Sequence, residues 1–401
     1  MKRCLWVVPK GIFPVRDGAR VANQALLKSV RPHFNEMDIM IFNEEDSDEL
    51  HISHYNKDFN PTNVYFFKRP SYKNILKKLF FLSINFVKAP HLPVTTGYFH
   101  TDKMKKEVRQ VLKHRKYDLI VFDGIHPYTA FMDMKEFKNI PVAYRAHNVE
   151  GDLWSTAASK TGNKIVQNLL LWQGKKMLDL EANLINRSER TWNIAEEDLK
   201  RYKELLNGDD KKLIYIPVGL EFKRSTSEKL VSKNDRIKLL FLGKMDWAPN
   251  KDGLKWFLED VWPHVDSEKL ELQIVGSGDS SWGTELFKQP GIKFIGFAKD
   301  LDAVYANCDF SVIPIRYGSG TRIKVIESIS KGVPIISTDM GVQGSGLKDF
   351  FHAETKEEWV KVLSILDRAH GQKMAQAAFI ELEKMYSPDS IGEKAFSSVK
   401  I

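Results

Sequence analysis

The chain has 401 residues, more than one hydrophobic core usually supports, so we expect two or three domains of about 150 residues each. Hydrophobic residues make up 43% and charged residues 28% of the chain, which excludes disordered, collagen-like and low-complexity proteins. The net charge of +8 is unevenly spread, because residues 66–116 hold thirteen Lys and Arg against two acidic residues while the rest is mildly acidic.

Cysteine content and hydropathy predict the compartment. Cys4 and Cys308 lie far apart and offer neither a disulfide framework nor a zinc-ligand spacing, which favours the reducing cytoplasm. The first apolar run is too short for a secretory signal, and no apolar stretch reaches the ~18 residues that a membrane span requires. We therefore expect a cytoplasmic protein that at most lies on the inner face of a membrane.

Short apolar runs alternate with longer helical patterns in the first half of the chain. Strands are predicted at residues 5–8, 37–42, 64–67, 119–122 and 142–144, followed by a long amphipathic helix at about 165–184. This alternation indicates a parallel sheet wound with crossover helices.

The basic region 66–116 interleaves cations with large apolar side chains, most clearly at residues 73–82. Such interleaving is typical of a helix that lies at a membrane interface. We prefer an anionic membrane surface to nucleic acid as its partner, because neither a zinc-finger spacing nor a single-strand-binding motif accompanies the charge. The solvated face of an ordinary amphipathic helix explains the pattern equally well.

Polar residues follow several strands of the first half, where ligands of open parallel sheets bind. The loop after the first strand contains Gly18 and Arg20, the loop after residues 119–122 contains His126, and the strand at 142–144 runs into Arg145 and His147. A glycine turn after a strand is common, and a histidine can simply cap a strand end, so these residues also have structural explanations.

The second half repeats the alternating pattern, with strands predicted at residues 238–242, 271–275, 292–295, 310–313 and 335–337. The predicted fold class is α/β, with two Rossmann-like parallel-sheet domains facing a cleft. We assign residues 1–205, onto which 385–401 packs back, to a first domain and residues 206–384 to a second domain. The chain becomes polar at 223–235, close to this boundary.

The most informative stretch is residues 314–334, where a buried strand ends, a turn follows at Gly318 to Gly320, and a helix begins near Thr321. Glycines let the backbone approach a ligand, and the start of a helix favours an anion. Arg322 and Lys324 bring two cations to the same place, and Glu327 could accept hydrogen bonds from a ribose diol. The combination suits a nucleoside diphosphate.

Four segments in this order, at residues 241–250, 272–278, 292–297 and 318–334, resemble the donor-binding half of retaining glycosyltransferases of the GT-B fold, specifically glycosyltransferase family 4 (group 1). The resemblance implies that Lys324 and Lys244 hold the donor diphosphate, that Glu327 binds the ribose, and that the backbone near Gly296 and Phe297 recognises the base. The first half resembles the family more weakly.

With this resemblance, the candidate residues fall into three groups. We assign catalytic roles to His147, Arg322 and Lys324, donor binding to Gly18, Lys244, Gly296, Phe297, Gly318, Ser319, Gly320, Thr321 and Glu327, and acceptor-side positions to Arg20, His126 and Arg145.

Three positions depart from the family pattern or leave a choice. The family tends to place a sugar-binding glutamate eight positions before Glu327, where this chain has Ser319, so sugar recognition is left to residues 319–321. Lys244 stands where an arginine is common, and it lacks the bidentate fork of a guanidinium. Either Asn250 or Lys251 could supply a second polar contact.

No metal or cofactor is expected beside the nucleotide-sugar co-substrate. The two Asp-x-Asp triplets, at residues 46–48 and 300–302, are explained by solvation and by helix capping.

The predicted function is transfer of a hexose-type sugar from a nucleotide diphosphate sugar to a hydroxyl of a glycan or lipid-linked acceptor, with anomeric retention, in the synthesis of a cell-surface polysaccharide or glycolipid. One alternative is a nucleotide-sugar epimerase on the same fold. Another is a binding module for nucleotide sugar or nucleic acid without catalytic activity.

Overall fold

Apolar strands from the first part of the chain pair in a seven-stranded sheet in the order β3-β2-β1-β4-β5-β6-β7, and every pairing is parallel. The computed structural model describes residues 2–14, 18–43, 51–70, 81, 83–84, 87–159, 161–208, 210–222, 236–318 and 322–401. The strands of this sheet are β1 (Arg3–Val8), β2 (Glu36–Asn43), β3 (Asn63–Lys68), β4 (Leu119–Asp123), β5 (Val142–Ala146), β6 (Arg190–Asn193) and β7 (Leu213–Tyr215).

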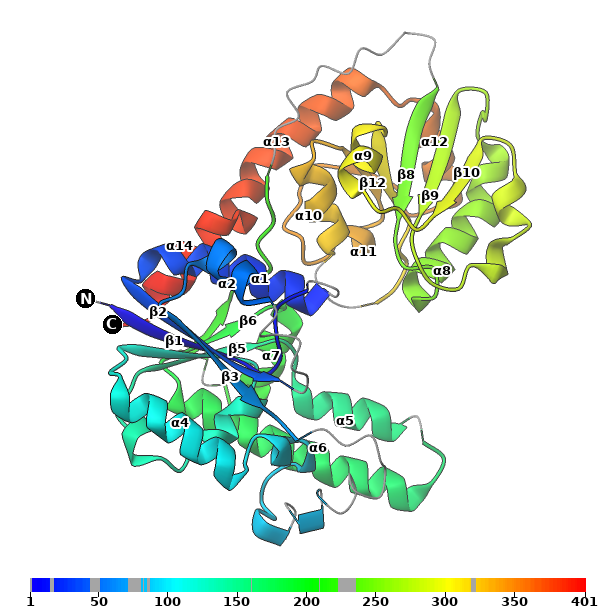
Figure 1. Ribbon diagram of the computed structural model, residues 1–401. Helices are drawn as coiled ribbons and strands as arrows, with labels where there is room; N and C mark the ends of the chain where they lie inside the picture. Colours follow the sequence, from blue (N-terminus) through cyan, green and yellow to red (C-terminus); the bar gives the residue numbers. More distant parts are fainter. Residues whose placement is uncertain are drawn as a thin grey trace. The chain divides into compact units, whose positions relative to one another are not determined.

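Successive residues of each strand point to opposite faces, so the sheet has a core on either side. Leu5 and Val7 of β1 belong to one core, while Cys4 and Trp6 belong to the other. Helices cover both faces in Figure 1. They are α1 (Gly18–Val30), α2 (Ile52–Phe59), α4 (Asp102–His114), α5 (Glu150–Ser159), α6 (Lys164–Arg187), α7 (Glu196–Leu205) and α14 (Pro388–Ser398).

The last helix of the chain, α14, packs on the first sheet through Ile391 and Ala395. A Cβ atom at Gly392 would lie 2.3 Å from the carbonyl oxygen of Ser29, so this close approach to α1 requires glycine. The first compact unit accordingly consists of Met1–Gly219 and Ile391–Ile401, and the second of Leu220–Ser390.

The second unit contains a six-stranded parallel sheet in the order β10-β9-β8-β11-β12-β13. Its strands are β8 (Ile237–Leu242), β9 (Leu270–Val275), β10 (Ile292–Gly296), β11 (Phe310–Ile313), β12 (Ile335–Ser337) and β13 (Phe351–His352). Its α-helices are α8 (Ala248–Trp256), α9 (Leu301–Ala306), α10 (Ile323–Ser330), α11 (Asp339–Val342), α12 (Lys356–Ser364) and α13 (Arg368–Tyr386).

Every strand predicted from an apolar run is present, whereas β6, β7 and β13 were not predicted. Strand β6 has the sequence Arg-Thr-Trp-Asn and β13 has two residues, so neither contains an apolar run. The first unit extends past the predicted boundary at residue 205 because β7 pairs with β6. The polar stretch 223–235 lies outside the described residues.

In both sheets the strand order reverses direction between two neighbouring strands, at β1 and β4 in the first unit and at β8 and β11 in the second. Loops that leave the carboxyl ends of the strands diverge at such a point and form a ligand-binding crevice. The residues after β4, β5, β8 and β11 are therefore the ones that each fold places for function. Among the described residues, no helix has both the length and the apolarity to cross a bilayer.

Candidate functional site

In the first unit, β4 ends at Asp123 beside the end of β5, and the strand register pairs Asp123 with Arg145. His147 follows β5 directly, and its Nε2 lies 2.5 Å from Oδ1 of Asp123. The indole nitrogen of Trp6 donates to Oδ2 of the same carboxylate at 3.2 Å. Three strands thus converge on one fully buried acid.

The charge of Asp123 is balanced within the protein. Burial alone would raise the pKa of its carboxyl, but Arg145, His147 and the hydrogen bonds from His147 and Trp6 together lower that pKa below its ordinary value. The carboxylate therefore stays ionised at neutral pH and accepts a hydrogen bond from the Nε2–H group of His147. This hydrogen bond fixes the imidazole and leaves Nδ1 as the ring atom that can meet a ligand.

Arg145, predicted at the acceptor side, is fully buried. Its Nη1 lies 3.3 Å from both oxygens of Asp123 and donates to Asn23, and its Nη2 donates to the carbonyl oxygen of Ala22 on α1 at 3.1 Å. A guanidinium in this position orients Asp123, and its acceptor-side role stays a prediction. The sequence showed only that Arg145 ends a strand, and not that the carboxylate of a neighbouring strand would cover it.

The other first-unit candidates have contacts of their own. Gly18 is the first residue of α1, and Arg20 on the same helix donates to the carbonyl oxygen of Pro14 at 2.9 Å. His126 is half-buried, and its ring is tilted by 40° against that of Phe99, with ring centroids 5.8 Å apart. Burial, and to a smaller extent the charge of Arg69, lowers the pKa of His126 to about 4, so this ring is neutral at physiological pH.

In the second unit, the ammonium of Lys324 on α10 donates to Oδ1 of Asn250 on α8 at 2.7 Å. The amide of Asn250 in turn donates to the carbonyl oxygen of Lys244 at 3.0 Å, which ties α10 to the loop after β8. Burial, with a smaller contribution from Arg322, lowers the pKa of Lys324 to about 7. No carboxylate among the described residues pairs with this ammonium, so a bound anion would supply the opposite charge.

Asn250 and Lys251, between which the sequence left a choice, lie in different surroundings. Its side chain is buried and bonded to Lys324, whereas Lys251 is exposed and lies 5.8 Å above the ring of Trp282. A Cβ atom at Gly243 would stand 2.5 Å from the amide nitrogen of Asn250, so the glycine after β8 makes room for this contact. The sequence indicated the position of Asn250, since this residue follows a proline at the start of a helix.

Arg322 anchors the loop before α10. Its Nη2 donates to the carbonyl oxygen of Gly318 at 2.9 Å, and its Nε donates to that of Met340 at 3.2 Å. Gly318 has a φ of +116°, a conformation that side chains other than glycine rarely adopt. The predicted sugar-binding residues Ser319, Gly320 and Thr321 lie outside the described residues, directly beyond this anchored point.

Glu327 is half-buried one turn after Lys324 and accepts a hydrogen bond from Tyr305 at 3.3 Å. Burial is the largest influence on its carboxyl and raises its pKa above the ordinary value, against the opposing effects of Tyr305 and Lys331. A half-buried carboxylate with one protein donor has acceptor capacity left for a diol.

The predicted base-binding residues lie at the end of β10. Gly296 has a φ of +71°, and its carbonyl oxygen accepts from Gly276 at the end of β9. A Cβ atom at Gly276 would be 1.8 Å from the carbonyl oxygen of Gly243, so glycines bring three neighbouring strand ends together. Phe297 is 71% exposed, as suits a ring that stacks on a base. Lys244 is exposed and pairs with Asp246 at 3.2 Å.

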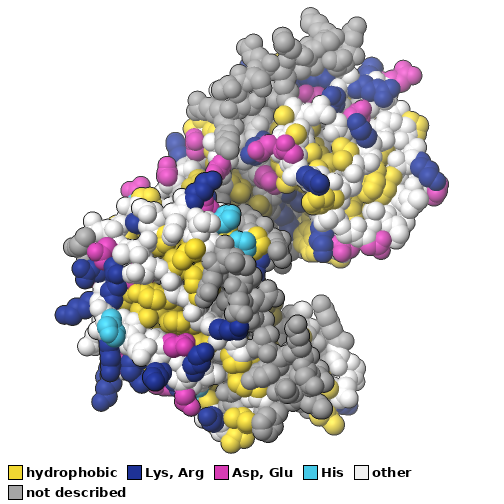
Figure 2. Space-filling model, viewed as in Figure 1, with side chains coloured by type: hydrophobic (Ala, Val, Ile, Leu, Met, Phe, Trp, Pro, Cys, Tyr) yellow, Lys and Arg dark blue, Asp and Glu magenta, His cyan; other side chains and the backbone are white. Residues whose placement is uncertain are grey.

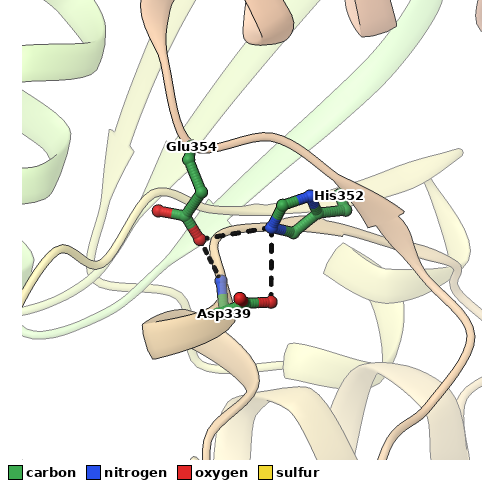
Figure 3. Close-up of side chains that lie close together, drawn as sticks. All are labelled: Asp339, His352 and Glu354. Carbon is green, nitrogen blue, oxygen red and sulfur yellow. Dashed lines mark hydrogen bonds and ion pairs between the residues drawn. The ribbon is translucent and has the colours of Figure 1, made fainter.

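The described residues include one group that could hold a metal ion, formed by Asp339, His352 and Glu354 (Figure 3). Nε2 of His352 lies 3.3 Å from an oxygen of each carboxylate, and Glu354 also accepts from the backbone amide of Asp339 at 2.5 Å. All three residues are exposed, and their contacts with one another account for the arrangement. The absence of a metal from the reaction stays a prediction.

The family model described as Glycosyl transferases group 1 matches residues 236–364, which include Asn250, Lys324 and Glu327. A relative from Klebsiella pneumoniae, an uncharacterized 44.6 kDa protein in the cps region, is 22% identical over 348 residues, or 83% of this chain and 82% of the relative.

Solved structures with the same architecture cover the whole chain. HepE of Anabaena in complex with UDP matches with a TM-score of 0.65 at 15% identity and covers 100% of both chains. The lipopolysaccharide outer core galactosyltransferase WaaB has a TM-score of 0.62 at 10% identity, covering 99% of this chain and 100% of its own. Sucrose-phosphate synthase from Thermosynechococcus elongatus has a TM-score of 0.61 at 12% identity, covering 99% of this chain and 98% of its own. The predicted fold is confirmed.

Proposed function

Because this chain is a GT-B-fold protein of the glycosyltransferase group 1 type, we propose that it transfers a hexose from a nucleotide diphosphate sugar to an acceptor hydroxyl with retention of configuration. The observation that carries the proposal is Lys324, a half-buried ammonium that donates to Asn250 and has no carboxylate partner among the described side chains. A diphosphate supplies the missing negative charge, and Glu327, one turn further along α10, is in reach of the ribose.

The reaction breaks the bond between the anomeric carbon and the donor phosphate oxygen and forms a bond from that carbon to the acceptor oxygen on the same face. The acceptor proton passes to the departing phosphate. Stabilising the negative charge that develops on this leaving group dominates such catalysis. We assign that role to Lys324 and Lys244 with the start of α10, which suffice without a divalent metal, and we assign the donor sugar to Nδ1 of His147.

Uridine is the base we propose for the donor, because HepE was solved with UDP and with UDP-glucose. The cps-region relative and the galactosyltransferase WaaB support a role in cell-surface polysaccharide or glycolipid synthesis. A lipid-linked acceptor would bring the protein to a membrane, where the basic region 66–116 is the proposed contact; residues 71–80, 82 and 85–86 of that region lie outside the described residues. Figure 2 shows Lys and Arg side chains over the first unit.

The test is an assay with a panel of UDP-sugars, with and without glycan and lipid-linked acceptors, followed by determination of the anomeric configuration of the product. A glycoside with the donor's configuration, formed also in the presence of a chelator, is the expected result. An epimerised sugar formed without acceptor would instead identify an epimerase, and binding without turnover in any acceptor mixture would identify a sensor. Lys324→Ala should abolish product formation, while Lys255→Ala, an exposed lysine on α8, should not.

A further inference from the structure

The first half of helix α6 carries large apolar side chains that the fold leaves uncovered. Ile165 is 81% exposed, Leu169 52% and Trp172 41%. Their spacing of four and three residues places them on one face of the helix. We infer that this face, with the neighbouring Ile84 and Val87, rests on an anionic membrane surface. The inference rests on the proposed membrane contact of residues 66–116 and identifies the side chains that insert.

The position of α6 explains why these residues are uncovered. The helix spans Lys164–Arg187, and its later part packs in the first core through Met177, Leu180 and Leu184. Gln173 is its first buried residue, so the preceding turns extend beyond the core. Figure 1 shows α5 and α6 as a helical pair that projects past the sheet of the first unit. Leu153 on α5 adds a further apolar side chain that is 50% exposed.

A second segment of the chain continues this surface. The backbone amide of Val94 donates to the side chain of Gln173 at 2.8 Å, and the ammonium of Lys176 donates to the carbonyl oxygen of Pro90. These contacts hold the segment that precedes Val94 beside α6. In that segment Val87 is 77% exposed and Ile84 is 40% exposed.

The charge around the apolar residues identifies the occupant. Residues 160–176 contain four lysines and no acidic residue. Lys164 and Lys175 are exposed next to the apolar face, and the ammonium of Lys176 lies 3.5 Å from the ring centroid of Trp172. Lysines beside tryptophan and aliphatic side chains are the composition of a helix that inserts its apolar face among lipid tails and places its cations among anionic headgroups.

A second copy of the chain fits the surface less well. In a twofold interface the same patch meets itself, so the lysines of both copies would be brought together. An anionic lipid surface instead complements the lysines and covers the apolar side chains at once.

The test uses the full-length protein and vesicles of phosphatidylcholine with and without phosphatidylglycerol. We expect flotation with the anionic vesicles at low salt, weaker binding at high salt, and little binding to neutral vesicles. Ile165→Glu combined with Leu169→Glu should lower the affinity for anionic vesicles by about tenfold or more, because two carboxylates replace inserted aliphatic groups. Ile365→Glu in the second unit is the matched control, since Ile365 is an apolar residue that is 65% exposed, and it should bind like the wild type.

Two further measurements keep the outcomes separate. Calorimetric affinity for UDP should be the same in the double variant and the wild type, so a loss of vesicle binding cannot be a failure of the donor site. The inference is overturned if the wild type ignores lipid charge, if the double variant still floats, or if sedimentation shows that the substitutions dissociate a dimer of this chain.

Discussion

Asp123 in the first unit is a buried anion whose partners Arg145, His147 and Trp6 all come from the protein. Lys324 in the second unit is instead a half-buried cation that donates to the neutral amide of Asn250. The pKa of Asp123 is lowered and that of Lys324 is also lowered, so the first group keeps its charge and the second tends to lose it. The charge of Asp123 is balanced by protein groups in the free protein, whereas the charge of Lys324 is balanced only when an anion binds.

The largest effect expected from this contrast is on stability. Asp123→Asn removes the only buried negative charge described between Arg145 and His147 and should lower the free energy of unfolding by about 3–5 kcal/mol, because a buried cation is left uncompensated. Denaturant unfolding followed by circular dichroism measures this change. Asp252→Asn is the control, since its ion pair with Arg316 is partly exposed and worth less than about 1 kcal/mol. Equal effects of the two substitutions would contradict the account.

Substitution of Glu327 should separate the contribution of the nucleoside to UDP affinity from that of the diphosphate. Glu327→Ala should weaken UDP binding about tenfold or more through the loss of charge-assisted hydrogen bonds to the ribose, while affinity for inorganic pyrophosphate stays unchanged. Glu259→Ala, an exposed glutamate after α8, provides the control for calorimetry of both ligands. A parallel loss of pyrophosphate affinity in Glu327→Ala would show that the carboxylate acts on the phosphates or on the fold.

The smallest effect is a pH dependence of donor binding. Lys324 has a pKa of about 7 in the free protein, and a bound diphosphate favours the charged form and raises that pKa. Binding above pH 7 therefore takes up a proton, so affinity for UDP-glucose should fall as pH rises, by at most about tenfold per pH unit. Calorimetry in buffers of different ionisation enthalpy measures the uptake. Lys324→Ala should show none of it, and a flat wild-type profile between about pH 7 and about pH 9 would contradict the assignment.

Much of the fold was predictable because buried parallel strands are continuous apolar runs, as at 119–122 and 310–313. Strand β6 was missed because its core contribution comes from a single large residue, Trp192, between polar neighbours. The donor-side residues were predictable because Lys324 and Glu327 lie on one helix, where sequence spacing fixes their separation.

The first-unit site could be predicted only in part. His147 stood out after a strand, but Asp123 also ends a strand and carried no signal that distinguished it from any polar strand-end residue. Its role depends on the register that sets β4 beside β5, and register is a property of the assembled sheet. The same applies to Arg145, which was predicted at the acceptor side from its place at a strand end and is buried on that carboxylate.

The central claim is that Lys324 is held ready for a diphosphate, and titration calorimetry with UDP tests it most directly. Lys324→Ala should lose about 10–100-fold in affinity while Lys255→Ala binds UDP like the wild type, because Lys255 pairs with Glu259 whereas the half-buried Lys324 has no carboxylate partner among the described residues. Equal UDP affinity of Lys324→Ala and the wild type would contradict the account.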